Sequence, residues 1–409
     1  MSEEKFAARS VRTVEEGRAE LGESFACPYC RTVSDLADVM SVSVSATLLG
    51  DRILGADEAQ RFLARHFTRN GLAIDAAGGV CTEFACPHCH MAVPRALLVS
   101  EQIVLSVVGA AGAGKSVFLA SSMWQCRQKL SRLFGMSFTD LDPVRNGWLN
   151  AYEEKLFFQR DGQALQQIEK TDLQAPTVCR SVKINGGSLL LPLPAFFSVR
   201  GPKSARASSL VVYDSAGEHF RAGADTQDKA VTLNMLAADM LYFMFDPSAD
   251  PRFQTMLDNG TGTAQNAAQR QDILLAEVAA RMRRHFGNRN KAPQTKPMIF
   301  GISKADLLHR QLPLTKELYC KLPDGQMALD LAELKRVSDA TEQLMMEVAS
   351  EMVTSAHDMA EEVWFIPVSA LGHNPLREGV RPCDIHPIWA EIPIVLTLAH
   401  KGLIPCVHT

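Results

Sequence analysis

The stretch SVVGAAGAGKSVFL, residues 106–119, contains the pattern G-x-x-x-x-G-K-[ST] at Gly109, Gly114, Lys115 and Ser116. It follows the apolar run IVLSVV and opens a helical pattern, which is the strand–loop–helix setting that a phosphate-binding loop requires. Glycines let the backbone N–H groups of such a loop converge on phosphate oxygens, and the helix start adds partial positive charge. The stretch therefore predicts a nucleotide-binding α/β domain.

Several side chains have predicted roles on the phosphate side. We expect Lys115 to reach the β- and γ-phosphates and Ser116 to offer its hydroxyl to Mg²⁺. Downstream, SLVVYDSAGE places Asp214 at the end of an apolar run and Gly217 three residues later. An acid there can hold Mg²⁺ through water, and the glycine lets its N–H approach a γ-phosphate. The loop's own nucleotide contacts are predicted at Gly109, Gly112, Ala113, Gly114 and Val117.

A second set of residues indicates which base is bound. In IFGISKADLL, Ser303, Lys304 and Asp306 follow an apolar run in the arrangement [NTS]-K-x-D. A carboxylate can accept two hydrogen bonds from the N1–H and N2–H₂ edge of guanine, a donor pair that adenine lacks. The alternative is an ordinary helix start with Asp306 as its N-cap. The later run FIPVSALG can offer a backbone N–H to guanine O6 from Ser369, Ala370 and Leu371.

The order of apolar runs predicts the fold class. Runs alternate with long helical patterns, including those near 266–286, 332–358 and 386–402, so we expect a doubly wound, mostly parallel, six-stranded sheet. No helix separates VCRSVKI from SLVVYD, and these two could pair as antiparallel neighbours. The six expected strands are IVLSVV, VCRSVKI, SLVVYD, MLYFMF, PMIFGI and VWFIPV.

The elements GAAGAGKS, DSAG, SKAD and SAL, in this order, resemble the Ras-like GTPase domain of the translation-factor class over about residues 101–409. The resemblance implies GTP and GDP as ligands, Mg²⁺ as cofactor, and a switch-one threonine that closes on both. Thr177, just before VCRSVKI, is the best match for that threonine, and Thr171 is the alternative.

Two departures from that family pattern bear on the rate of hydrolysis. Many relatives carry glutamine or histidine after D-x-x-G, whereas this chain has Glu218 and then His219. An ionised carboxylate is a poor neighbour for a γ-phosphate. In addition, the methyl group of Ala111 in the loop can crowd an incoming arginine. The predicted catalytic set is Lys115, Thr177, Gly217, Glu218 and His219, and we expect slow turnover without a partner.

Two near copies, FACPYCRT and FACPHCHM, predict a metal site. They supply Cys27, Cys30, Cys86 and Cys89, and two such knuckles can give four thiolates to one tetrahedral Zn²⁺. Four free buried cysteines are the alternative. Three neighbours, Cys81, His88 and His90, could replace a ligand, but we expect each to stand outside the site.

The segment between the cysteine pairs has helical spacing in GADEAQRFLARHF, so a helical insert is predicted at 55–67. Residues 23–98 hold six arginines, no lysine and eight acids, a net charge of −2. Nucleic-acid affinity needs clustered positive charge, so a protein-docking module is favoured. The expected divisions are a polar tail (1–22), a zinc-binding ribbon-like module (23–98) and a GTPase domain (99–409).

Cysteine knuckles ahead of a phosphate loop, together with the tail DIHPIWAEIPIVLTLAHKGLIP, resemble the bacterial double-GTPase families. That resemblance implies a nucleotide switch in a bacterial conflict or defence system, with protein effectors. The alternatives are a zinc-stapled adaptor whose nucleotide is structural and scarcely hydrolysed, and a P-loop ATPase. No export signal, lipidation signal or apolar run of about 20 residues is seen, so we expect a cytoplasmic protein without a membrane span.

Overall fold

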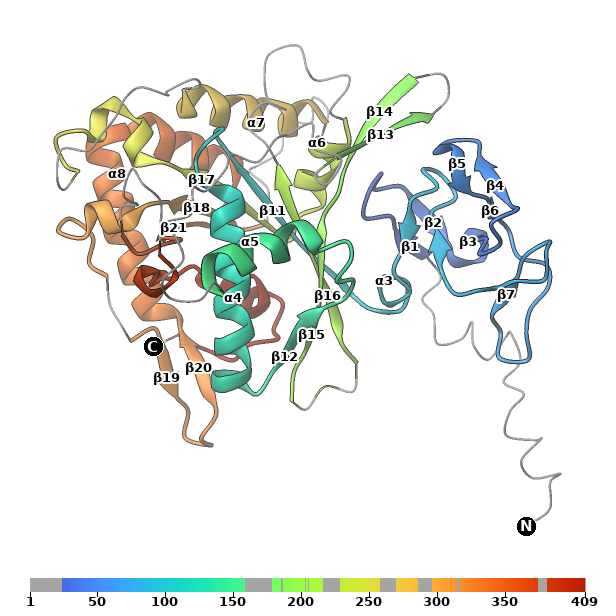
Figure 1. Ribbon diagram of the computed structural model, residues 1–409. Coiled ribbons are helices and arrows are strands. Elements are labelled where there is room, and N and C mark those ends of the chain that lie inside the picture. Colours follow the sequence, from blue (N-terminus) through green and yellow to red (C-terminus); the bar gives the residue numbers. More distant parts are fainter. Residues whose placement is uncertain are drawn as a thin grey trace.

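The structure is a computed structural model that describes residues 24–158, 179–184, 187–202, 204, 206–215, 229–257, 270–285, 296–314, 317–373 and 381–408. A large α/β body follows a smaller N-terminal part that is built of short strands (Figure 1). Within these residues, no helix combines the length and the apolar character that crossing a membrane would require.

The α/β body is organised around one seven-stranded sheet in the order β12-β15-β16-β11-β17-β18-β21. Five neighbouring strands, from β16 to β21, run parallel, and the two strands at the other edge are antiparallel. The strands are β11 (Gln102–Gly109), β12 (Ser137–Asp140), β15 (Ala195–Arg200), β16 (Ser208–Ser215), β17 (Met240–Phe245), β18 (Met298–Ile302) and β21 (Val363–Pro367).

Five of the six strands expected from the apolar runs are confirmed, because parallel strands buried on both faces read as continuous apolar sequence. The expected place of VCRSVKI is wrong. It forms β13 (Cys179–Ile184), which pairs with β14 (Gly187–Pro192) as a separate ribbon. The antiparallel neighbour of β16 is instead β15, whose alternate side chains are buried on both faces of the sheet. With β12 added beyond β15, the sheet has seven strands rather than six.

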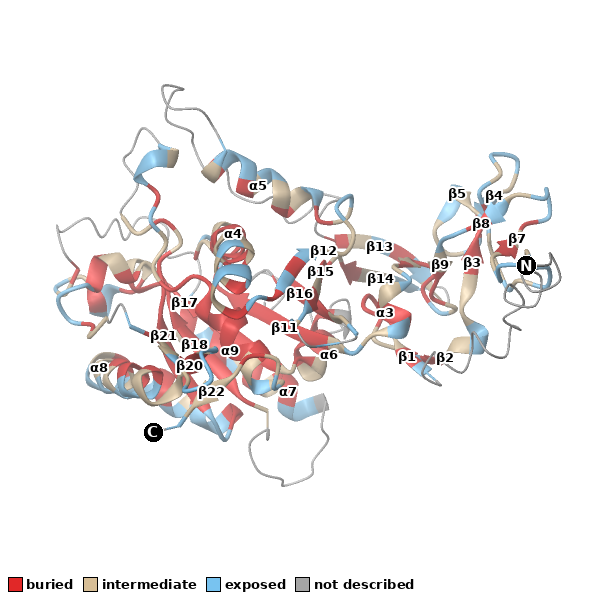
Figure 2. Cartoon of the chain, turned by 90° about the horizontal axis from the view of Figure 1, so that it is seen from below, coloured by how far each residue is buried: buried red, intermediate tan, exposed pale blue. Residues whose placement is uncertain are grey.

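Helices cover both faces of the sheet (Figures 1 and 2). On one face, α4 (Lys115–Phe134), α5 (Gly147–Phe157) and α9 (Ile392–His400) share a core with the sheet strands. On the other face, α6 (Lys229–Ala237), α7 (Gln271–His285) and most of α8 (Leu331–Met359) pack against β17, β18 and β21. A small sheet of β19 (Tyr319–Lys321), β20 (Met327–Asp330) and β22 (Cys406–Val407) lies beside them.

Two of the expected helices are confirmed and a third is shorter than expected. Both α7 and α8 lie where the sequence predicted them. The last helix begins at Ile392 rather than near residue 386, because Trp389 has a left-handed φ of 51° that interrupts helical geometry. Pro393 lies in the first turn of α9, where backbone N–H groups make no hydrogen bond within the helix, so the missing N–H of proline costs nothing.

The N-terminal part consists of short strands, followed by α3 (Ala96–Val99). The helical insert predicted at 55–67 is wrong, since this segment forms β5 and β6, which pair with β4 and β3. Leu63 and Phe67 are 55% and 43% exposed, so no apolar helix face is buried there. The strands are β1 (Ser24–Ala26), β2 (Val33–Asp35), β3 (Met40–Val42), β4 (Leu49–Asp51), β5 (Gly55–Ala59), β6 (Arg61–Phe62), β7 (Ala73–Ile74), β8 (Val80–Cys81), β9 (Phe84–Ala85) and β10 (Ala92–Val93).

One carboxylate ties the loops of this N-terminal part together. Asp75 accepts hydrogen bonds from the Ser43 hydroxyl at 2.9 Å and from the backbone N–H groups of Val44, Ser45 and Gly79 at 3.2, 3.2 and 2.8 Å. Burial raises the pKa of Asp75, but these hydrogen bonds outweigh it and lower the pKa to about 2. The loops around Asp75 are thus held together by hydrogen bonds to one acid.

The contact between β17 and β18 makes a testable prediction. A Cβ at Gly301 would overlap the buried ring of Tyr242 on the neighbouring strand, whose hydroxyl and ring carbons leave no room for it. We expect Gly301→Ala to lower the free energy of unfolding by about 1–3 kcal/mol, the usual cost of overpacking. The measurement is the denaturant midpoint of unfolding. Gly147→Ala is the matched control, because no atom lies within 4 Å of its Cβ position; equal midpoints for both variants would contradict the prediction.

Candidate functional site

The phosphate loop joins the end of β11 to the start of α4. Gly109 is the last residue of β11, and a Cβ there would lie 2.5 Å from the carbonyl oxygen of Met244 on β17, so only glycine fits. Gly112 and Gly114 have φ angles of 79° and 86°, a region that glycine enters at low cost. The Lys115 ammonium donates to the carbonyl oxygens of Gly109 and Ala110, both at 2.9 Å. The loop is therefore curled around its own lysine.

Next to this loop, the structure brings two predicted magnesium residues together. The Ser116 hydroxyl donates to Asp214 Oδ2 at 2.7 Å, although 98 residues separate them in sequence. The contact exists because β16 pairs in parallel with β11, with Val107 opposite Asp214. Asp214 Oδ1 is buried and finds no hydrogen-bond partner among the described residues. A hydroxyl beside a partly buried carboxylate with one unpartnered oxygen suits a hard cation such as Mg²⁺ or a water bound to it.

On the base side, the predicted lysine has a partner that the sequence analysis missed. Lys304, with a left-handed φ of 52°, donates its ammonium to Asp246 Oδ2 at 2.6 Å and to Ser248 Oγ at 2.8 Å. Asp246 directly follows β17, and its backbone is clamped by two 2.8 Å hydrogen bonds with the Gln271 amide. The signal was available, because acids at the carboxyl ends of parallel strands line the site edge of such sheets.

The predicted guanine acid contacts the SAL segment. Asp306 lies in the 3₁₀ turn Ala305–Leu308, and its Oδ1 accepts a 2.5 Å hydrogen bond from the Ser369 hydroxyl. The Ala370 carbonyl in turn accepts a 2.8 Å hydrogen bond from Ser121 of α4. These two hydrogen bonds connect Asp306 to the loop after β21 and connect that loop to α4.

The structure thus gathers the predicted nucleotide residues at the carboxyl ends of β11, β16 and β18 and in the loop after β21. Ala113 and Leu371 are buried, and Val117 packs against the core beneath α4. The predicted switch and catalytic residues Thr177, Gly217, Glu218 and His219, together with Thr171, lie outside the described residues. Their roles stay predictions.

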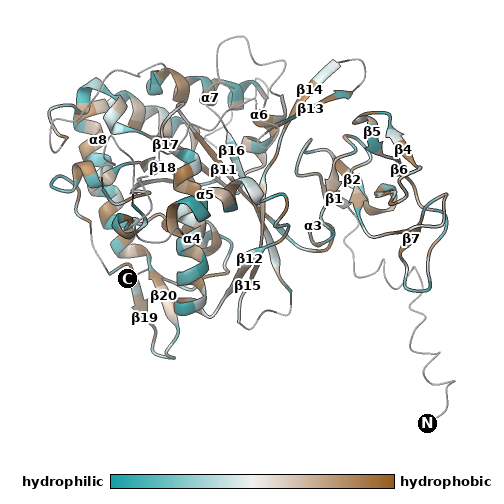
Figure 3. Ribbon diagram, in the orientation of Figure 1, coloured by the Kyte–Doolittle hydropathy of each residue, from teal (hydrophilic) through white to brown (hydrophobic). Residues whose placement is uncertain are grey.

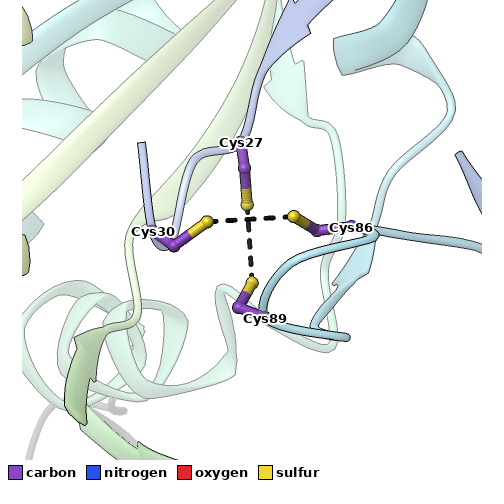
Figure 4. Close-up of side chains that lie close together, drawn as sticks. All are labelled: Cys27, Cys30, Cys86 and Cys89. Atoms are coloured by element: carbon purple, nitrogen blue, oxygen red, sulfur yellow. Dashed lines mark hydrogen bonds between the residues drawn. The ribbon is translucent and has the colours of Figure 1, made fainter. Parts of the chain in front are cut away.

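A second site lies in the N-terminal part, where four cysteines converge (Figure 4). The Sγ atoms of Cys27, Cys30, Cys86 and Cys89 all lie within 4.8 Å of one another, and the four residues are buried. The Cys27–Cys89 and Cys30–Cys86 sulfur distances are 3.7 and 3.8 Å, far longer than a disulfide. A tetrahedral site with Zn–S bonds of about 2.3 Å has edges of about 3.8 Å. The cluster therefore has the dimensions of a Cys₄ zinc site.

The two cysteine knuckles have matching backbone geometry, as their sequences suggest. Tyr29 and His88 each donate a backbone N–H to the sulfur of the first cysteine of their pair, both at 3.4 Å. Arg31 and His90, the residues after each pair, have left-handed φ angles of 58° and 59°. N–H groups aimed at sulfur stabilise thiolate charge, which is what metal ligation demands.

Close packing of the four thiols shifts their pKa values in opposite directions. Burial raises the pKa of Cys27, whereas hydrogen bonds from Cys27, Cys86 and Cys89 lower the pKa of Cys30. The three expected bystanders stand outside the cluster of close sulfurs: Cys81 contacts Asp75, His90 bonds Asp51 at 2.7 Å through Nδ1, and His88 is exposed. Whether any of these three joins a metal site stays a prediction.

Comparison with solved structures gives distant similarities. A crystal structure of Era with MgGDPNP and a 16S ribosomal RNA segment is 11% identical, with a TM-score of 0.26, covering 76% of this chain and 59% of that one. The GTPase-like domain of Saccharomyces cerevisiae Ski7, bound to GTP, is 16% identical (TM-score 0.26; 76% and 52% covered). Sup35 with GDP is 11% identical (TM-score 0.25; 69% and 41% covered).

Comparison with known sequences gives one informative similarity. The putative ESX-1 scaffolding and assembly protein SaeC of Mycolicibacterium smegmatis is 30% identical over 200 residues. The match covers 48% of this chain and 43% of that protein, so it spans less than half of either. No protein-family model matches the chain.

Proposed function

We propose that this protein is a GTP-binding, slowly GTP-hydrolysing switch of bacterial origin, in which a zinc-stapled N-terminal module docks other proteins. The observation that carries the proposal is the convergence at one sheet edge of the Ser116–Asp214 pair and the Asp306–Ser369 pair. The first pair suits a magnesium-bound triphosphate, and the second holds an acid where a base edge would lie.

Guanine selectivity is the part of the proposal best supported by geometry. The Ser369 hydroxyl donates to Oδ1 of Asp306 and helps to orient the side chain. Each carboxylate oxygen can accept more than one hydrogen bond, so both oxygens remain able to accept from a base. An acceptor-only carboxylate matches the adjacent N1–H and N2–H₂ donors of guanine and mismatches the ring acceptor of adenine. The Lys304 stem, held by Asp246, lies on the same edge. This arrangement favours GTP over the ATPase alternative.

On the phosphate side, this chain's residues can do three things. Lys115 can exchange its two carbonyl acceptors for β- and γ-phosphate oxygens, the loop N–H groups can cradle the phosphates, and Ser116 with Asp214 can hold a cation or its water. Ser116 and Asp214 would hold Mg²⁺ or its water, and the cation would supply positive charge against the phosphates. We assign the predicted Thr177 and Gly217 to nucleotide-dependent ordering, as in other switch GTPases.

The N-terminal module is proposed as the part that meets protein partners. Its net charge of −2 over residues 23–98 does not favour nucleic acid. The similarity to a putative scaffolding and assembly protein supports a role in protein assembly and fits an adaptor whose nucleotide is scarcely hydrolysed as well as a switch. We assign Zn²⁺ to the four clustered cysteines, where it would staple the two knuckles.

The first test concerns base choice. Asp306→Asn should weaken GTP binding at least tenfold, about 1.4 kcal/mol, and shift preference toward xanthine nucleotides. The amide N–H₂ group would face the N2–H₂ donors of guanine, whereas xanthine has an accepting oxygen at that position. Nucleotide affinities by calorimetry measure this. Asp324→Asn is the matched control, an exposed acid in the turn before β20. Equal affinity of the unmutated chain for ATP and GTP would refute guanine selectivity.

The second test concerns the metal. The purified chain should contain one zinc, and Cys27→Ser should lose most of it and melt at a lower temperature, because metal binding and folding of the module are linked. Elemental analysis and thermal unfolding are the measurements. Cys383→Ser, at an exposed thiol, should change neither. A zinc-free unmutated protein, or a Cys27→Ser variant with unchanged metal content and melting, would sink the assignment.

The third test concerns rate. Intrinsic hydrolysis of Mg²⁺-GTP by the isolated chain should be slow, on the order of 10⁻³ s⁻¹ or below, since Glu218 follows the D-x-x-G motif. Single-turnover assays measure it. A rate above about 1 s⁻¹ would mean that the catalytic machinery is complete within this chain, and His219→Ala would then be the next variant. Tightly bound GTP that is not hydrolysed even with partners would favour the adaptor alternative.

A further inference from the structure

The N-terminal module and the nucleotide-binding sheet share one buried core. The cysteine cluster with Phe25 and Tyr29 packs against Val104 of β11, Phe196 of β15 and Val211 of β16. The Tyr29 and Phe196 rings meet edge to face with centroids 6.1 Å apart. The two parts are therefore joined by a continuous apolar contact. Figure 2 shows that much of β15 and β16 is buried. We call this core the knuckle–sheet cluster.

Polar contacts within the knuckle–sheet cluster meet at Tyr213 of β16. Its side chain is buried, and its hydroxyl donates to the carbonyl oxygen of Pro28, inside the first knuckle. The Arg31 guanidinium, just after that knuckle, donates to the same hydroxyl at 3.4 Å. The Tyr213 hydroxyl thus makes two hydrogen bonds to the first knuckle and the residue after it.

The next residue along β16 is the candidate magnesium acid. Successive side chains of a strand point to opposite faces, so Tyr213 faces the knuckle while Asp214 faces the start of α4. In register, Tyr213 lies opposite Ser106 of β11 and Asp214 opposite Val107. The hydrogen bond between Ser116 and Asp214 measures 2.7 Å, so a small shift of the end of β16 would break it. The first knuckle and the candidate cation site therefore contact opposite faces of the same short stretch of β16.

We propose that Tyr213 is a positioning residue that links the folded first knuckle to Asp214 and so sets the Mg²⁺ dependence of nucleotide binding. The inference rests on the proposed function and adds regulation to it. While Pro28 and Arg31 hold the phenol, β16 ends in one place and Asp214 meets Ser116. When the knuckle loosens, the strand end gains freedom, and the acid loses its orientation toward the cation. By thermodynamic reciprocity, bound Mg²⁺-nucleotide must strengthen metal retention by the knuckles.

The test compares two tyrosine-to-phenylalanine variants in the full chain. Tyr213→Phe removes the link to the knuckle. Tyr29→Phe is its matched control: it is equally buried in the same cluster, and its hydroxyl accepts from Arg145 at 2.9 Å, but it does not adjoin Asp214. A fluorescent guanine nucleotide is titrated at a series of Mg²⁺ concentrations and again without Mg²⁺. Zinc content and melting temperature are measured for all three proteins.

The expected result is specific to one variant and one ligand. Tyr213→Phe should raise the half-saturating Mg²⁺ concentration about three- to tenfold, with near-normal Mg²⁺-free affinity and zinc content. This is the loss expected for the one Ser116–Asp214 hydrogen bond whose geometry the variant disturbs. Tyr29→Phe should leave the Mg²⁺ dependence unchanged. Equal shifts in both variants, or none in either, would overturn the positioning role. Failure of the unmutated chain to bind guanine nucleotide at any Mg²⁺ concentration would overturn the proposed function itself, and the two failures are read from different proteins.

Discussion

The arrangement of the whole α/β body depends on strand β11 having parallel partners on both sides. Its N–H and C=O groups are shared with β16 and β17, so the carboxyl ends of all three strands reach the same edge. The chain must leave β11 in a tight loop, and β17 approaches so closely that a Cβ at Gly109 would lie 2.5 Å from the Met244 carbonyl oxygen. The same pairing that builds the core therefore positions the phosphate loop, Asp214 and Asp246.

Around that edge, the cationic side chains are held by acceptors of the protein itself. Lys115 is bound by two loop carbonyl groups, and Lys304 by Asp246 and Ser248. Under the proposed function, each lysine is already ordered at the sheet edge where a phosphate or a base would bind. The lysines are thus pre-ordered, and pre-ordering reduces the entropy lost on binding. Lys304 is partly exposed, so its ion pair adds more to orientation than to stability.

The N-terminal module has much less apolar core than the α/β body and is stabilised differently. Its strands are two to five residues long, and large apolar side chains of the module, such as Val33, Leu49 and Leu63, are exposed. Figure 3 shows hydrophobic and hydrophilic residues mixed along this part of the ribbon. Such a small apolar core does not stabilise the module by itself, so other interactions must hold it together, as in small domains generally. Three are present: the four clustered cysteines, the hydrogen bonds to Asp75, and the knuckle–sheet cluster. The last of these makes the sheet part of the module's core.

The amino-acid sequence by itself determined the elements whose signals are local. Buried parallel strands read as unbroken apolar runs, so β11, β16, β17, β18 and β21 could be found from single segments. The long helix α8 has sustained apolar periodicity, and the phosphate loop and the repeated CPxC pairs need particular residues at fixed spacing. Each of these depends on neighbours a few residues away, which a sequence displays directly.

Only the tertiary structure decided the features that depend on distant partners. Whether β13 or β15 lies beside β16 is set by which strand can bury both faces, and GADEAQRFLARHF forms strands because β3 and β4 supply hydrogen-bonding edges. The contacts Lys304–Asp246, Asp306–Ser369 and Tyr213–Pro28 join residues 58, 63 and 185 positions apart. Sequence spacing carries no information about such contacts, because the closure of the sheet and the docking of the knuckles bring these side chains together.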